Sequence, residues 1–97
     1  MFRHVVLLRF TPESTPEQHQ AVVAALATLP AHLPVLRSYD VALDAGLADG
    51  NWHVSAVADF DDAAGWQTYT VDPEHQRIIA EMIRPILAER AAVQHEL

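Results

Sequence analysis

Histidine is the residue type in this sequence with the clearest capacity for chemistry. The chain of 97 residues has six histidines and no cysteine, so thiol catalysis, zinc–thiolate sites and iron–sulfur clusters are excluded. An imidazole ordinarily titrates close to neutral pH, and it can therefore accept or donate a proton under physiological conditions. The first question is which histidines the fold places on an apolar, concave surface.

His75 is the strongest candidate for a general base. It follows Asp72-Pro73, a pattern typical of a helix start, so it lies in the first helical turn, where the helix dipole disfavours an imidazolium. Burial on an apolar stripe would disfavour the charged ring further and leave a neutral ring able to accept a proton. The stripe continues at helical spacing through Ile78, Ile79, Met82 and Ile86. The alternative is a structural histidine, buried and hydrogen-bonded to a backbone carbonyl.

Tyr69 and His4 are the other two candidate catalytic residues. The phenol of Tyr69 could hydrogen-bond His75 or stabilise a developing enolate, or its ring could pack while its hydroxyl stays hydrated. His4 lies on the more apolar face of a predicted strand, where it could orient a substrate oxygen or tie strand ends together. If a cavity opens beside His75, its predicted apolar lining is Val6, Leu8, Leu26, Ile78, Ile79 and Met82.

Other kinds of site have little support in the sequence. No two histidines are four residues apart on a predicted helix, and there is no glycine-rich phosphate loop, so we expect neither a metal ion nor another cofactor. No serine lies in a recognisable nucleophile turn. We expect the remaining candidates to be surface or packing residues, namely His19, His32, His53, His95 and Trp66.

The hydrophobic pattern predicts the elements that must position these side chains. Strands are expected at 3–10, 36–43, 52–60 and, from a weaker signal, 91–95. Helices are expected from Pro16 to about Leu29, over 63–69, and from Pro73 until Arg84-Pro85 interrupts the last one. The order strand, helix, strand, strand, helix, strand predicts an α+β, ferredoxin-like βαββαβ sandwich with a four-stranded antiparallel sheet. The length suits a single domain over residues 1–97.

Composition limits the partners. Thirteen acidic and six basic residues give a formal charge of −7, which argues against nucleic acid and anionic membrane surfaces. The longest apolar run of the first strand, Val5–Leu8, is too short for a signal peptide or a membrane span, so we expect a cytoplasmic protein. Both faces of that strand are apolar, and helices cover one face of such a sheet. We therefore expect a homodimer formed through the other face.

Four separated segments resemble the stress-responsive dimeric A/B barrel family. They are His4–Phe10, Asp59–Asp62, Tyr69–His75 and Ile83–Leu87, in the family's order and spacing. The resemblance implies a ferredoxin-like protomer whose sheet packs face to face with a second copy to form a β-barrel. Most members of the family have no established activity.

One plant branch of the family carries out a cofactor-free cyclisation of a linear polyketide. Its pocket tyrosine and histidine correspond to Tyr69 and His75, and a further pocket histidine corresponds to His4. This chain departs from that branch at two positions: a tyrosine of the first helix is absent from Val22–Leu26, and Asp72 stands in place of a histidine. A shared fold does not by itself transfer the reaction.

Three functions therefore remain open from the sequence. The first is a cofactor-independent enzyme, such as a polyketide cyclase or lyase, acting on a small apolar carbonyl compound with His75 as base. The second is a non-catalytic homodimer that binds a small apolar molecule or contributes to stress tolerance. The third is a monooxygenase of the antibiotic-biosynthesis type, built on the same dimeric barrel.

Overall fold

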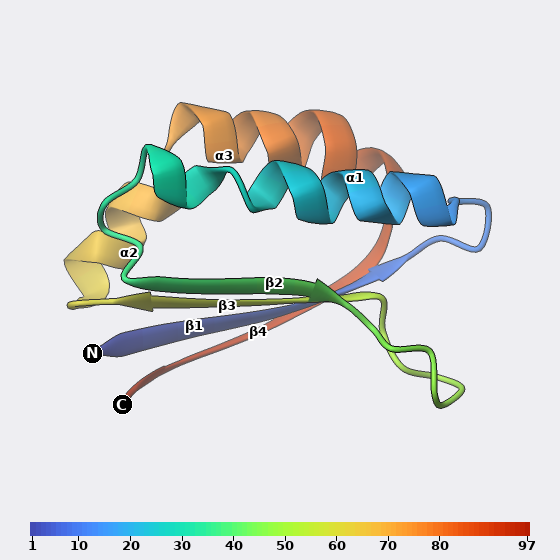
Figure 1. The fold of residues 1–97 in the computed structure, drawn as a ribbon, viewed down its shortest axis with the longest axis horizontal. Coiled ribbons are helices and arrows are strands. Elements are labelled where there is room, and N and C mark those ends of the chain that lie inside the picture. Colours follow the sequence, from blue (N-terminus) through green and yellow to red (C-terminus); the bar gives the residue numbers. More distant parts are fainter.

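The computed structural model describes residues 1–97 as one sheet with helices on a single face (Figure 1). The sheet order is β2-β3-β1-β4, and every neighbouring pair is antiparallel. The predicted ferredoxin-like α+β sandwich is confirmed. The strands are β1 (Phe2–Phe10), β2 (Ser38–Leu43), β3 (Val54–Phe60) and β4 (Leu87–Glu96).

The helices begin where the sequence places caps and prolines. Thr15 and Gln18 form a capping box at the start of the first helix, and the carboxylates of Asp62 and Asp72 cap the next two. None of the helices has the length and apolar character needed to cross a lipid bilayer. The helical elements are α1 (Pro16–Leu26), η1 (Leu29–Ala31), α2 (Ala63–Thr70), α3 (Pro73–Ile78), η2 (Ile79–Ile83) and η3 (Arg84–Ile86).

The boundaries of four elements differ clearly from the predicted ones. The first helix ends at Leu26, and Pro30 lies in a separate 3₁₀ turn, because a proline cannot donate the next helical hydrogen bond. β2 and β3 each begin two residues later than expected. β4 is far longer than residues 91–95, because pairing along the whole of β1 stabilises a strand that its own polar residues hardly indicate.

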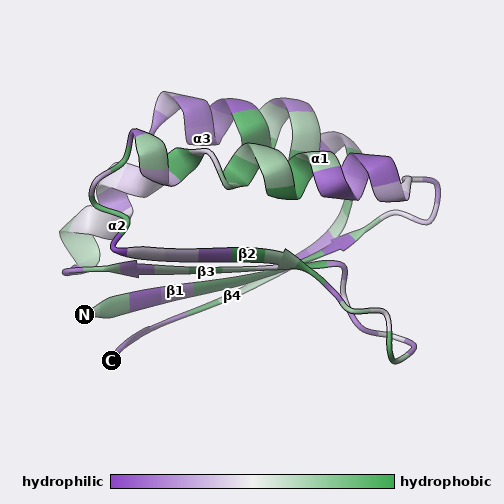
Figure 2. Ribbon diagram, viewed as in Figure 1, coloured by the Kyte–Doolittle hydropathy of each residue, from purple (hydrophilic) through white to green (hydrophobic).

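The core lies between the helices and the inner face of the sheet. Fourteen buried residues form it, and Phe60, Leu29 and Val22 are fully covered. Along β1 the side chains of His4, Leu8 and Phe10 are buried, so His4 lies on the core side, as the alternation predicted. Figure 2 shows the first turns of α1 as hydrophilic and its middle as hydrophobic.

The outer face of the sheet carries exposed apolar side chains. Leu7 is 42% exposed and Val93 is 63% exposed, and the register pairs Val93 with Val5 across β4 and β1. A contiguous apolar surface of this kind is typical of a protein–protein interface.

Replacing Thr15 with alanine tests the helix start. The Thr15 hydroxyl accepts the Gln18 N–H at 3.2 Å, and losing this cap should lower the free energy of unfolding by about 1 kcal/mol. Urea denaturation measures the change. Thr15→Ser retains the hydroxyl and should stay close to the wild type; equal stability of the alanine variant would contradict the capping role.

Candidate active site

A cavity of about 320 Å³ lies between the inner face of the sheet and the helices. His4 from β1, Tyr69 from α2 and His75 from α3 all line it. The ring centroids of His4 and Tyr69 are 6.4 Å apart, and those of Tyr69 and His75 are 4.1 Å apart. The structure thus brings His4 beside Tyr69 and His75, which are distant from it in the sequence, and all three side chains border open space.

The backbone around α3 fixes the proton on the His75 ring. The Asp72 carboxylate accepts the His75 N–H at 3.0 Å and sets the first turn of the helix. The Nδ1 atom of His75 lies 3.0 Å from the Tyr69 carbonyl oxygen, and a carbonyl can only accept, so Nδ1–H is the donor. The other ring nitrogen, Nε2, has no hydrogen-bond partner in the protein. Every fully buried side-chain nitrogen or oxygen does have one, so Nε2 is not fully buried. Because His75 lines the cavity, we read Nε2 as the proton acceptor available there.

Burial keeps the His75 ring neutral. The residue is only 8% exposed, and this burial lowers the pKa of His75 below its ordinary value. The carbonyls of Tyr69 and Thr70 and the charge of Asp72 oppose the shift, while the nearby Arg90 adds to it. The net effect agrees with the direction expected for a histidine in the first turn of a buried helix.

His4 has the opposite tautomer. Its Nδ1 accepts a hydrogen bond from the side-chain amide of Gln94, at 2.9 Å, so the proton of the neutral ring is on Nε2. Burial first, and then the charges of Arg90 and His75, lower the pKa of His4 to about 4. At neutral pH the ring is therefore uncharged and offers an N–H donor.

The two histidines are chemically complementary. His75 presents a lone pair on Nε2, and His4 carries a hydrogen on Nε2. One can take a proton from a bound molecule while the other donates a hydrogen bond to an oxygen on which negative charge develops. Different surroundings give two residues of the same type different tautomers, an arrangement that acid–base chemistry can use.

Tyr69 does not make the hydrogen bond with His75 that its position in the sequence allowed. Its hydroxyl lies 3.0 Å from the hydroxyl of Tyr39 on β2 instead. Burial raises the pKa of Tyr69, although the hydrogen bond with Tyr39 and the charge of Arg90 oppose the shift. Its ring stacks on His75 at an interplanar angle of 28°. Tyr69 therefore packs against the face of the imidazole and restricts its orientation, while Tyr39 holds the Tyr69 hydroxyl.

The predicted apolar lining is only partly found. Val6, Leu8, Leu26 and Ile79 line the cavity, whereas Ile78 and Met82 do not. Ile78 is fully buried in the core instead, and Met82 packs against it. In a helix of 3.6 residues per turn, Ile78 and Ile79 lie on opposite sides of the direction of His75, so one can face the core while the other faces the cavity. His75, Ile79 and Ile83, each four residues apart along α3 and η2, line the cavity.

Several lining residues were not predicted from the sequence. Trp66 was expected to be a packing residue, yet its ring lies 5.9 Å from that of His4. Its position three residues before Tyr69 on one helix was the available signal. Arg84 from η3 and Arg90 from β4 also line the cavity, and Arg90 could not be placed there without the register of β4 against β1.

A second group of histidines has a structural role. The Nδ1 atom of His53 accepts the Phe10 N–H at 3.0 Å, and His19 Nε2 lies 2.7 Å from the Ser14 hydroxyl. That hydroxyl donates to the Thr11 carbonyl at 2.6 Å, so its proton is not directed toward His19. Nowhere do three histidine, aspartate or glutamate side chains converge closely enough to hold a metal ion.

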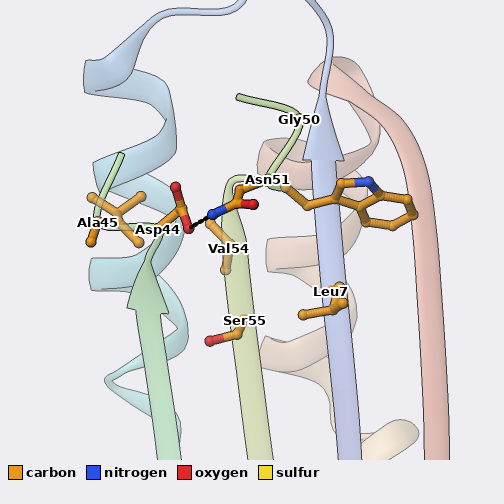
Figure 3. A pocket seen from close by; sticks show the side chains of 9 residues that line it. Leu7, Asp44, Ala45, Gly50, Asn51, Val54 and Ser55 are labelled. Atoms are coloured by element: carbon orange, nitrogen blue, oxygen red, sulfur yellow. Dashed lines mark hydrogen bonds between the residues drawn. The ribbon is translucent and has the colours of Figure 1, made fainter. Parts of the chain in front are cut away.

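A larger hollow of about 520 Å³ lies beneath the β2–β3 connection (Figure 3). Leu7, Ser55 and Asn51 are among its lining residues, and the Asn51 amide donates to Asp44 at 3.1 Å. No histidine or tyrosine lines it, so it lacks a group for proton transfer near neutral pH. The smaller cavity is therefore the candidate active site.

The layering and strand order define a ferredoxin-like α+β protomer, and the cavity between its sheet and helices is the candidate site. The chain belongs to the Stress responsive A/B Barrel Domain family, whose sequence model matches residues 2–96. A dimeric ferredoxin-like protein of unknown function from Thermobifida fusca YX is 42% identical, with a TM-score of 0.89, over 99% of this chain and 90% of that one. No curated protein matches the sequence.

More distant solved structures share the fold. A hydroxynitrile lyase from Passiflora edulis is 15% identical, with a TM-score of 0.80, over 97% of this chain and 90% of its own. An antibiotic biosynthesis monooxygenase is 14% identical, with a TM-score of 0.75, over 100% of this chain and 98% of its own. At these identities the likeness shows the architecture alone.

The titration of His4 tests the electrostatics of the site. The pKa of His4 falls from 6.5 in the unfolded chain to about 4 in the fold, so in that interval only the unfolded chain binds the proton. The titration of His4 should therefore not affect the free energy of unfolding above pH 6.5. It should lower that free energy by up to roughly 3 kcal/mol as the pH drops to about 4. NMR of the imidazole measures the pKa, and urea denaturation measures the stability.

His4→Gln, which cannot be protonated, should lack this part of the pH dependence. An imidazole of His4 that titrates at its ordinary value in the folded protein would contradict the assignment.

Proposed function

We propose that this protein is a cofactor-independent enzyme of the polyketide cyclase or lyase type, which acts on a small carbonyl compound. The observation that carries the proposal is the pair of neutral histidines, with opposite tautomers, on one largely apolar cavity. Sites that remove a proton next to a carbonyl need both a base and a donor to the oxygen. His75 and His4 supply these two groups.

The proposed step starts with a compound that has an acidic C–H between two carbonyl groups. His75 Nε2 takes that proton, and the electron pair of the C–H bond moves onto a carbonyl oxygen as an enolate. The Nε2–H of His4 donates a hydrogen bond to that oxygen. The enolate carbon then attacks a second carbonyl of the same molecule, forming a C–C bond, and the imidazolium of His75 returns its proton to the new alkoxide.

Two further features support this assignment. Tyr69 stacks on the His75 ring, and the Tyr69 carbonyl fixes its tautomer, so the base is held in one orientation before substrate arrives. The fold also occurs in a protein named as a hydroxynitrile lyase, which is compatible with lyase chemistry on this scaffold.

Replacing His75 with glutamine tests the base. With a panel of linear 1,3-diketones, the wild type should accelerate exchange of the central C–H for deuterium, and His75→Gln should lower that rate roughly 10²- to 10⁴-fold. NMR in D₂O follows the exchange. Because the pKa of His75 is lowered, the rate should level off at a pH below the ordinary histidine value and fall on further acidification.

His95→Gln is the matched control, since His95 is exposed on β4 and should leave the rate unchanged. An unchanged rate in the His75 variant would rule out the base. Saturable binding of the diketones without exchange would favour the non-catalytic function, and oxygen consumption with a hydroquinone probe would favour a monooxygenase.

We also propose that the protein forms a homodimer through the outer face of the sheet. The exposed side chains of Leu7 and Val93 on this face support it, as does the 42% identical protein, which is described as dimeric. Val93→Glu buries a charge in the proposed interface, so sedimentation should show the mass of one chain. Val71→Glu, at an exposed apolar position that follows α2, should remain dimeric; a dimer in both variants would exclude this face.

A further inference from the structure

The charged residues around the candidate site are unusual for so acidic a chain. The sequence has 13 acidic and 6 basic residues, yet none of the acidic ones lines the cavity. The charged lining residues are Arg84 and Arg90 alone. The cavity is therefore the place where this negatively charged protein presents positive charge to a bound molecule.

These two arginines also differ from the other four in their partners. Arg3 binds Asp59 through two nitrogens at 2.8 and 2.9 Å, and Arg37 binds Asp61 in the same way. Arg9 pairs with Glu89, and Arg77 pairs with two glutamates on the helix surface. Arg84 and Arg90 have no carboxylate within ion-pair distance, so both guanidinium groups are free to bind a ligand.

The fold places the two arginines on different walls of the cavity. Arg90 lies directly opposite Leu8 in the β1–β4 register, so it extends from the inner face of the sheet. Arg84 comes from η3, at the end of the helical layer. The charge of Arg90 reaches the centre of the site, where it contributes to the lowered pKa of both His4 and His75.

We propose that the cavity binds a carboxylate-bearing molecule, whose carboxylate pairs with Arg90 and Arg84 and whose apolar part lies along Val6, Leu8 and Ile79. A guanidinium matches a carboxylate through two parallel hydrogen bonds. The inference rests on the proposed function only for the reacting end of the substrate, which would be a carbonyl within reach of His75.

Binding of a carboxylate would also change the basicity of His75. Arg90 disfavours a proton on His75 by charge repulsion, and a bound carboxylate would cancel much of that repulsion. The pKa of His75 should therefore rise when an acid binds and stay unchanged when a neutral analogue binds. In this way a substrate acid would strengthen the base that acts on it.

The test compares 3-phenylpropanoate with 3-phenylpropanamide, which have nearly the same shape and differ in charge. NMR titration of the whole protein should show at least tenfold tighter binding of the acid, with shifts at His4 and His75. Arg90→Gln should remove the preference, and Arg84→Gln should reduce it. Arg77→Gln, on the helix surface, is the matched control and should retain the full preference.

Equal affinity for acid and amide in the wild type, an acid preference that survives Arg90→Gln, or no binding of either probe would each overturn the inference. Arg90 and Arg84 are exposed and unpaired, so both variants should fold like the wild type, which circular dichroism checks.

The two proposals can fail separately. Selective binding of the acid without exchange activity would support the arginine site and exclude the proposed enzymatic function. Exchange activity on neutral diketones, without any preference for acids, would support the enzymatic function and exclude the arginine site.

Discussion

The candidate site depends on two hydrogen bonds at the start of α3. The Asp72 carboxylate holds the His75 N–H, and the His75 ring bonds back to the Tyr69 carbonyl. This short loop of chain fixes the helix start, the tautomer of the base and the direction of its free nitrogen together. Asp72 remains ionised for this role, because the His75 N–H and His32 outweigh the effect of its burial and lower its pKa.

The sheet supplies the complementary half of the site. Antiparallel pairing places Gln94 opposite His4 and Arg90 opposite Leu8, so β4 sets the tautomer of His4 and supplies one of the two arginines that line the cavity. The strand is otherwise largely exposed. The register of β4 matters for the site, because a shift by one residue would turn the side chains of Gln94 and Arg90 to the other face of the sheet.

A small chain must divide its apolar residues between a core and a cavity. Fully buried side chains such as Phe60 and Val22 fill one part of the layer between sheet and helices, while the small Ala56 leaves room for the cavity in another. Along α3 and η2, Ile78 is buried in the core, whereas Ile79 and Ile83 line the cavity.

The order of the elements, the capped helix starts at Thr15 and Asp72, and the core-facing side of β1 could all be predicted from the sequence, because they follow from local hydrogen bonding and from the alternation of side chains. The sequence also singled out His4, Tyr69 and His75. The partner of the Tyr69 hydroxyl, the length of β4 and the placement of Arg90 beside the histidines could be known only from the folded structure. Each of these depends on residues distant in sequence, whose pairing register is set by the packing of the whole sheet and which no local pattern records.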